Sequence, residues 1–128
     1  MWKPNCIVES ISLSELFNGV PESVRVYARE QIRAGWRFYP VNQCRGRCYY
    51  KAKAITIPLW VIQSTLPGKK IWYISHELAH TYTSGDIHGQ KFMNQLKAIC
   101  PQEHQHWEIN YKPRTAIAAG ISFNKDFL

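Results

Sequence analysis

The residues of this chain best suited to chemistry lie between positions 71 and 89. His76, Glu77 and His80 form the pattern H-E-x-x-H. Residues four apart on a helix share one face, with about 5–6 Å between their Cβ atoms. The two imidazoles can therefore converge on one Zn²⁺ ion at about 2.0–2.1 Å. Glu77 stands beside them and can act on a zinc-activated water without being a ligand, so the pattern predicts metal-assisted hydrolysis.

The surrounding sequence is consistent with an amphipathic helix. At about 100° per residue, one arc is apolar and suited to a core: Ile71, Ile74, Leu78 and Tyr82. A second arc carries the candidate chemistry: Tyr73, His76, Glu77 and His80. Gly85 is placed to end the helix, and Asp86 is placed to cap the next one.

A catalytic zinc ion needs three protein ligands and one open position. His88 is the best third ligand, because it begins a second amphipathic segment that Phe92, Leu96 and Ile99 anchor in the core. We therefore expect a second, ligand-bearing helix. Two alternatives stay open, namely Asp86 and the histidines of the stretch 102–107, His104 and His106.

These residues also carry a family resemblance. The segment His76-Glu77-Leu78-Ala79-His80, followed by His88-Gly89-Gln90-Lys91-Phe92-Met93, resembles the SprT-like (Spartan-type) zinc metallopeptidases, in which a ligand His is followed by Gly and, shortly after, Phe. Gly46-Arg47-Cys48 and Ile55-Thr56-Ile57 resemble the small sheet that precedes the catalytic helix in that family. The resemblance implies a zincin-like core, zinc ligation by His76, His80 and His88, and Glu77 as the catalytic base.

The elements expected around this site define an α+β fold. Pro21-Glu22-Ser23 opens a helix that runs to about Gly35, since Pro and Glu both favour the first turn. Three short strands follow, at 36–41, 47–51 and 54–58, and we expect them to form an antiparallel sheet. The chain of 128 residues is predicted to be one domain, 1–128, and a monomer.

Composition and charge narrow the class of protein. With 45% hydrophobic residues the chain is globular, and no apolar run is long enough to span a membrane. The start of the chain has no signal-peptide pattern, so we expect a cytoplasmic protein. Cys6, Cys44, Cys48 and Cys100 are scattered and read as reduced thiols. A second metal site or a disulfide at Cys44 and Cys48 stays as the alternative.

The net charge of +7 favours polyanionic partners. Arg25, Arg29 and Arg33 repeat every four residues along the predicted helix, and Arg45 and Arg47 lie near the first strands. One interpretation is a solvated helix face. The other is a nucleic-acid-binding surface of these five arginines, with DNA as a candidate partner.

The residues together predict a zinc-dependent metalloendopeptidase with one Zn²⁺ per chain and a protein or peptide substrate. The resemblance implies DNA-associated or DNA-crosslinked proteins as that substrate. Tyr73, Tyr111 and His106 are candidates for stabilising the oxyanion. The exposed edge of the small sheet can bind an extended substrate by strand addition. The alternative is a nucleic-acid-binding or protein-interaction module that keeps the scaffold with little or no turnover.

Overall fold

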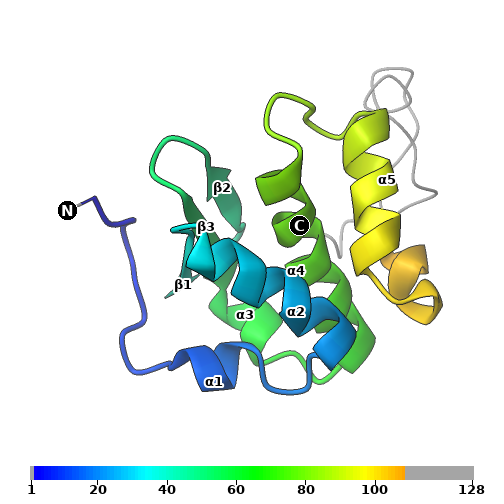
Figure 1. Cartoon of the computed structure of the whole chain (residues 1–128). Coiled ribbons are helices and arrows are strands. Elements are labelled where there is room, and N and C mark those ends of the chain that lie inside the picture. The colour runs from blue at the N-terminus through cyan, green and yellow to red at the C-terminus, as the bar shows by residue number, and fades with distance from the viewer. Residues whose placement is uncertain (1, 109–128) are drawn as a thin grey trace.

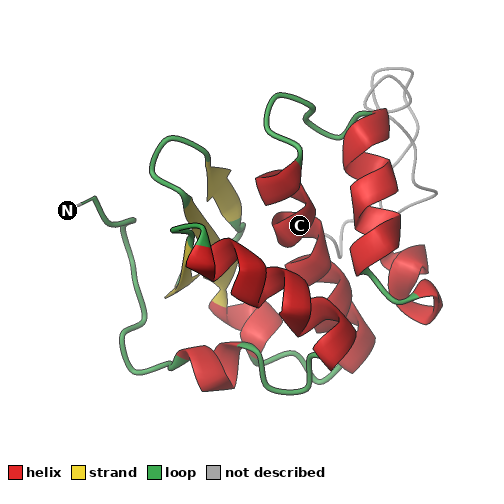
Figure 2. Cartoon of the chain, viewed as in Figure 1, coloured by secondary structure: helices red, strands yellow, loops and turns green. Residues whose placement is uncertain are grey.

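The computed structural model describes residues 2–108. It contains helices and one small sheet, which confirms the predicted α+β class (Figure 2). In chain order the elements are α1 (Leu13–Leu16), α2 (Glu22–Arg33), β1 (Arg37–Val41), β2 (Arg47–Tyr49), β3 (Ala54–Pro58), α3 (Leu59–Ile62), α4 (Pro67–Tyr82), α5 (Gln90–Ile99) and the 3-10 helix η1 (Gln102–Trp107). The predicted domain, 1–128, extends beyond the described residues. Between residues 2 and 108 no helix has the length and apolar character needed to cross a bilayer.

Helix α4 runs through the middle of the molecule, between the sheet and α5 (Figure 1). It also contacts α2, α3 and η1. Its apolar arc behaves as predicted, because Ile71, Ile74 and Leu78 are buried in the core. The opposite arc is covered as well, since Tyr73, Glu77 and His80 are each less than a tenth exposed. The histidines of α4 therefore face a confined space between elements rather than an open surface.

The sheet corrects the prediction of an antiparallel arrangement. Its strand order is β1-β3-β2, with β1 parallel to β3 and β2 antiparallel to β3. The three strands lie where they were predicted. An antiparallel sheet of three successive strands would place β1 beside β2, but β3 lies between them. Residues 42–46 carry the chain past β3 to the far edge, and β2 returns to β3 through a short connection.

This order makes β3 the central strand and places β2 at an edge. All five residues of β3 are buried, so both faces of this strand are covered. Ile55 and Ile57 point into the main core with Phe38 of β1. The opposite, outer face carries Ala54 and Thr56, which are also buried.

The segment after α4 corrects a second expectation, because His88 is not part of a helix. It lies two residues before α5, with a left-handed φ of +57°. Asp86 explains the turn, since its carboxylate Oδ2 accepts a hydrogen bond from the Phe92 backbone N–H at 2.9 Å. The capping role predicted for Asp86 is thereby confirmed. A Cβ on Gly89 would lie 2.0 Å from the same carboxylate, so the turn requires glycine there.

The N-terminal elements are tied to α4 by a buried lysine. Ser12 caps α1, because its hydroxyl accepts a hydrogen bond from the Glu15 backbone N–H. Lys70, in the first turns of α4, donates from Nζ to the carbonyl oxygens of Glu15 at 3.2 Å and Asn18 at 2.8 Å. The side chain is only 6% exposed, so its charge is satisfied mainly by the carbonyls that end α1.

Replacement of Lys70 tests this link. Lys70→Met keeps a long unbranched side chain but removes the lysine donor from both carbonyl oxygens, and the Glu15 oxygen keeps only the bond from the Asn18 backbone N–H. We expect the free energy of unfolding to fall by about 1–3 kcal/mol. Urea denaturation monitored by circular dichroism measures this change. Lys91→Met is the matched control, because Lys91 is exposed on α5. Equal unfolding midpoints for the two variants would contradict the role assigned to Lys70.

Candidate metal centre

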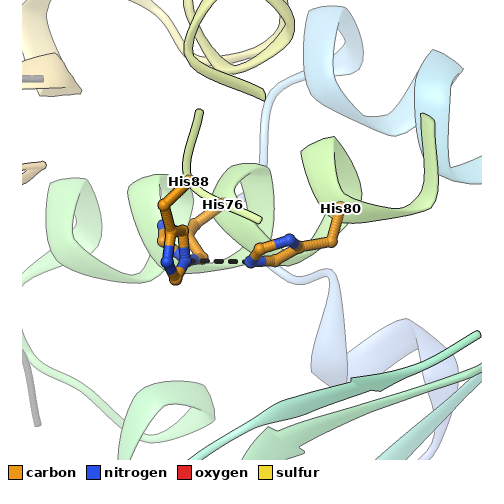
Figure 3. Close-up of side chains that lie close together, drawn as sticks. All are labelled: His76, His80 and His88. Carbon is orange, nitrogen blue, oxygen red and sulfur yellow. Dashed lines mark hydrogen bonds between the residues drawn. The ribbon is translucent and has the colours of Figure 1, made fainter. Parts of the chain in front are cut away.

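The two histidines of the H-E-x-x-H pattern point to one place, as helical spacing predicts. His76 and His80 lie one turn apart on α4, and their Nε2 atoms are 3.3 Å apart. His88 reaches the same place from the turn before α5, with its Nε2 atom 3.2 Å from Nε2 of His76. Figure 3 shows the three imidazoles converging through these nitrogens.

The nitrogen spacing fits a tetrahedral metal ion. Four ligands at about 2.0–2.1 Å from Zn²⁺ have edges of about 3.3–3.4 Å in a tetrahedron. The two Nε2 separations, 3.3 and 3.2 Å, match that edge. All three ligand atoms lie within 4.8 Å of one another. The three histidines therefore lie close enough to bind one metal ion.

Phe92 holds the three imidazoles in place. Its ring centroid lies 4.9 Å from that of His76, 4.4 Å from that of His80 and 5.0 Å from that of His88. The Phe92 side chain is almost fully buried, so its ring is a fixed wall behind the cluster. From the sequence, Phe92 was predicted to anchor the segment after His88 in the core and was part of the motif resemblance, but its contact with all three imidazoles was not predicted.

The competing ligands predicted from the sequence do not join the cluster. Asp86 is engaged in capping α5. His104 packs against Gly68, eight residues before His76, which is about 12 Å along a helix axis. His106 is exposed and stacks on Trp107. Within residues 2–108 the histidine trio is the only group of three or more such donors that could hold a metal ion.

Glu108 is a functional candidate that sequence reasoning missed. Its Oε1 accepts hydrogen bonds from Nδ1 of His76 at 2.5 Å and from Nε1 of Trp72 at 2.9 Å. Accepting from Nδ1 fixes the His76 tautomer that leaves Nε2 unprotonated and free for a metal ion. Nothing in the spacing of the chain links Glu108 to His76, 32 residues earlier. The only signal is an acidic residue after a histidine-rich stretch.

The electrostatics of this pair favour an ionised carboxylate beside the imidazole. Burial alone disfavours both charges, but the Glu108 carboxylate raises the pKa of His76 above its usual range. Burial also opposes ionisation of Glu108, yet His76 holds the pKa of that carboxyl below its ordinary value. A carboxylate in contact with a ligand histidine makes the imidazole a stronger electron donor.

Tyr50 gives His80 a partner of a different kind. Its hydroxyl lies 3.3 Å from Nδ1 of His80. In the tautomer that leaves Nε2 free, the His80 Nδ1–H donates to this oxygen. Burial, together with the positive charges of His76 and His88, lowers the pKa of His80 to about 2. His80 is therefore neutral, which is the form that binds a metal ion.

Glu77 lies on the same helix and is 5% exposed. Burial raises its pKa to about 7, with His76 opposing and Glu108 reinforcing the shift. Burial and the charge of Glu77 also raise the pKa of the Cys48 thiol and of the Tyr50 hydroxyl, each to about 12. Near neutral pH both groups are protonated, so Glu77 has neutral neighbours on the side of the sheet.

Tyr73, His106 and Tyr111 were the candidates for stabilising the oxyanion. The Tyr73 hydroxyl is buried and accepts a hydrogen bond from the Gly46 backbone N–H at 2.7 Å, which anchors the connection between β1 and β2. This contact gives Tyr73 a structural task. His106 stacks on Trp107, and Tyr111 lies outside the described residues.

The five arginines predicted to bind nucleic acid lie on two elements and their connections. Arg25 donates to the Phe17 carbonyl oxygen at 3.0 Å, and Arg29 pairs with Glu22. Arg33 is exposed at the end of α2, and Arg45 and Arg47 are exposed before and within β2. Two of the three helix arginines therefore have intramolecular partners. That the five arginines together form a nucleic-acid-binding surface stays a prediction.

Within residues 2–108 no cysteine belongs to a group of three or more donors that could hold a metal ion, and none forms a disulfide. Cys100 is buried and Cys48 is half-buried.

Comparison of the chain with protein-family models, curated proteins and solved structures finds no match.

Metal content tests the histidine cluster. We expect one divalent ion per chain after loading and gel filtration, and loss of that ion in His88→Ala, because two imidazoles on one helix leave the site incomplete. The double variant His104→Ala/His106→Ala should keep its metal, since neither residue reaches the cluster. Elemental analysis of both proteins measures this. Full metal in the first variant with loss in the second would overturn the assignment.

A second prediction concerns Glu108. Removing its carboxylate in Glu108→Ala should lower metal affinity about 10- to 100-fold, as expected when a ligand histidine loses its acceptor. Glu108→Gln retains an acceptor oxygen and should lose less. Competition with a chromophoric chelator measures the affinities, and Glu103→Gln, exposed on η1, is the control. Affinity equal to the parent in Glu108→Ala would exclude this role.

Proposed function

We propose that this protein is a zinc-dependent metalloendopeptidase with a zincin-like core. The observation that carries the proposal is the convergence of His80 and His88 on His76, with Nε2 separations of 3.3 and 3.2 Å, beside Glu77 of helix α4. Imidazole nitrogens at this spacing suit Zn²⁺. We assign one zinc ion per chain to His76, His80 and His88.

The donor set supports a catalytic rather than a structural ion. Structural zinc sites are closed by four protein ligands, whereas catalytic sites leave one position open. Between residues 2 and 108 the cluster contains three donors and no fourth. A buried carboxylate with a pKa near 7 beside the ligands has no use in a structural site, but it suits a general base at neutral pH.

Each residue around the proposed zinc site has a separate role in the reaction. Bound zinc supplies a Lewis acid that acidifies water to a pKa of about 7 and polarises the scissile carbonyl. Glu77 takes the proton of the attacking water and passes it to the leaving amine. Glu108 and Tyr50 keep the ligand tautomers fixed, and Phe92 keeps the imidazoles from rotating out of the site.

Strand β2 is the element best placed to bind substrate. It is an edge strand of the sheet and contacts α4. Tyr50 follows it directly and reaches His80, so the edge ends beside the metal ligands. An extended peptide paired with β2 through main-chain hydrogen bonds would bring a backbone carbonyl to the site. This mode of binding suits an unfolded protein segment.

DNA-associated or DNA-crosslinked proteins are the substrate class that we propose, in keeping with the resemblance and with the net charge of +7. The competing function is a nucleic-acid-binding or interaction module without turnover. The two differ in what Glu77 contributes, since a module of that kind does not need a proton acceptor beside the metal ligands.

The variant Glu77→Gln distinguishes the peptidase from a module without turnover. The amide keeps the shape of the side chain but cannot accept the proton, so turnover should fall by at least about 10²- to 10⁴-fold. Zinc content and unfolding midpoint should be unchanged. Cleavage of denatured casein, with and without DNA, followed by gel electrophoresis measures turnover. Glu103→Gln is the matched control. Equal rates in Glu77→Gln and the parent would exclude Glu77 as the base.

A further inference from the structure

The outer face of the sheet carries an ordered set of aromatic and basic side chains. One row across the strands is Arg37, Ala54 and Tyr49, and the next is Tyr39, Thr56 and Arg47. Successive side chains of a strand alternate between its two faces. Because Phe38, Cys48 and Ile55 pack into or against the core, these two rows face outward. Each row pairs one arginine with one tyrosine across a small central residue.

Trp2 lies over this face. Its ring centroid is 4.8 Å from that of Tyr49 and 6.5 Å from that of Tyr39. Ala54 and Thr56, at the centre of the face, are buried. The indole itself is 44% exposed, which is high for the largest apolar side chain. The two tyrosines thus support an aromatic platform whose outer side meets solvent.

The charge around this platform is positive. From residue 31 to residue 76 the chain has no Asp or Glu, but it has eight Lys and Arg residues. Arg37 and Arg47 are exposed, and within residues 2–108 neither makes a salt bridge. The Arg37 guanidinium donates a 3.3 Å hydrogen bond to the neighbouring Trp36 carbonyl oxygen. Both guanidinium groups can therefore bind an anion without breaking an ion pair.

We propose that this outer face binds single-stranded nucleic acid, with a base stacked on Trp2 and backbone phosphates held by Arg37 and Arg47. An aromatic platform flanked by cations is the arrangement that binds single strands, because every unpaired base offers a π-face and every nucleotide a phosphate. Bases inside a duplex are stacked on each other and cannot use the platform. DNA and RNA strands share this chemistry.

The proposal shares Arg47 with the predicted surface of five arginines, but it differs from that surface in its other residues, Trp2 and Arg37, and in its mechanism. It uses aromatic stacking, and it places the strand on the face of the sheet opposite the core. It also stands apart from the proposed peptidase activity, since neither Trp2 nor the two arginines touch the histidine cluster. A failure of either proposal leaves the other intact.

The experiment measures binding of labelled single strands by fluorescence anisotropy. It uses the full chain without an N-terminal tag, because Trp2 is near that end. A mixed-sequence DNA strand, the same sequence as RNA and a DNA duplex are compared across a salt series. The variants are Trp2→Leu, Trp2→Tyr and Arg37→Gln/Arg47→Gln. Arg29→Gln/Arg33→Gln is the matched control, because it removes the same charge from exposed positions on α2.

We expect the parent to bind single strands more tightly than the duplex. Trp2→Leu should weaken binding about 5- to 150-fold with an unchanged salt slope, because stacking releases no counterions. Trp2→Tyr should restore most of the affinity. Arg37→Gln/Arg47→Gln should flatten the slope of log K against log salt by about 0.7 for each lost phosphate contact. The α2 pair should change binding less. Preference for DNA or for RNA identifies which strand is the partner.

Four results would overturn the proposal. The first is no binding of any strand at 0.1 M salt, and the second is equal binding of duplex and single strands. The third is unchanged affinity in Trp2→Leu, or a Trp2→Tyr protein as weak as Trp2→Leu. The fourth is an equal loss in the sheet and α2 pairs, which would indicate charge attraction spread over the whole protein. The circular dichroism spectrum and the unfolding midpoint of every variant should match those of the parent, which shows that the fold is retained.

Discussion

The histidine cluster depends on how the turn between α4 and α5 is held. Two imidazoles on one helix define a line, and a third nitrogen must come from elsewhere to define a metal position. His88 supplies it from a left-handed backbone conformation, which a non-glycine residue keeps only where its surroundings impose it. Asp86 imposes it by capping Phe92, and Gly89 leaves room for that carboxylate. The Phe92 ring then packs on all three imidazoles. The residue whose backbone N–H binds Asp86 therefore also holds the three histidine side chains in place.

A buried carboxylate completes this arrangement. An ionised carboxylate away from water is costly unless it is paired and hydrogen-bonded. Glu108 meets that condition through His76 and Trp72, which lie one turn apart on α4. The same two contacts join the segment after η1 to the central helix. The hydrogen bond that sets the His76 tautomer is therefore also part of the packing of the fold. For Glu77, one residue further along α4, burial is the largest influence and raises the pKa of the carboxyl.

Local patterns predicted local structure well and long-range contacts poorly. The spacing of His76 and His80, the arc of Ile71, Ile74 and Leu78, and the cap at Asp86 all depend on residues a few positions apart, and the structure confirms them. His88 was correctly predicted to join the other two histidines, but it does so from a turn rather than from a helix. Glu108 and Tyr50 approach the ligands from distant parts of the chain, and no periodicity links them to α4. The parallel pairing of β1 with β3 was missed for the same reason, because strand order depends on how residues 42–46 cross the end of the sheet.

The alternation of side chains along a strand allows one small sheet to support two kinds of surface. The inner face contributes Phe38, Ile55 and Ile57 to the core on which α4 rests. A shift of one residue in register would exchange the faces, and would move these core residues outward while bringing arginines toward the histidines. Positive charge near the ligands would oppose metal binding, since the ion itself is a cation. The register that packs the core therefore also keeps Arg37 and Arg47 on the far side of the sheet from the histidine cluster.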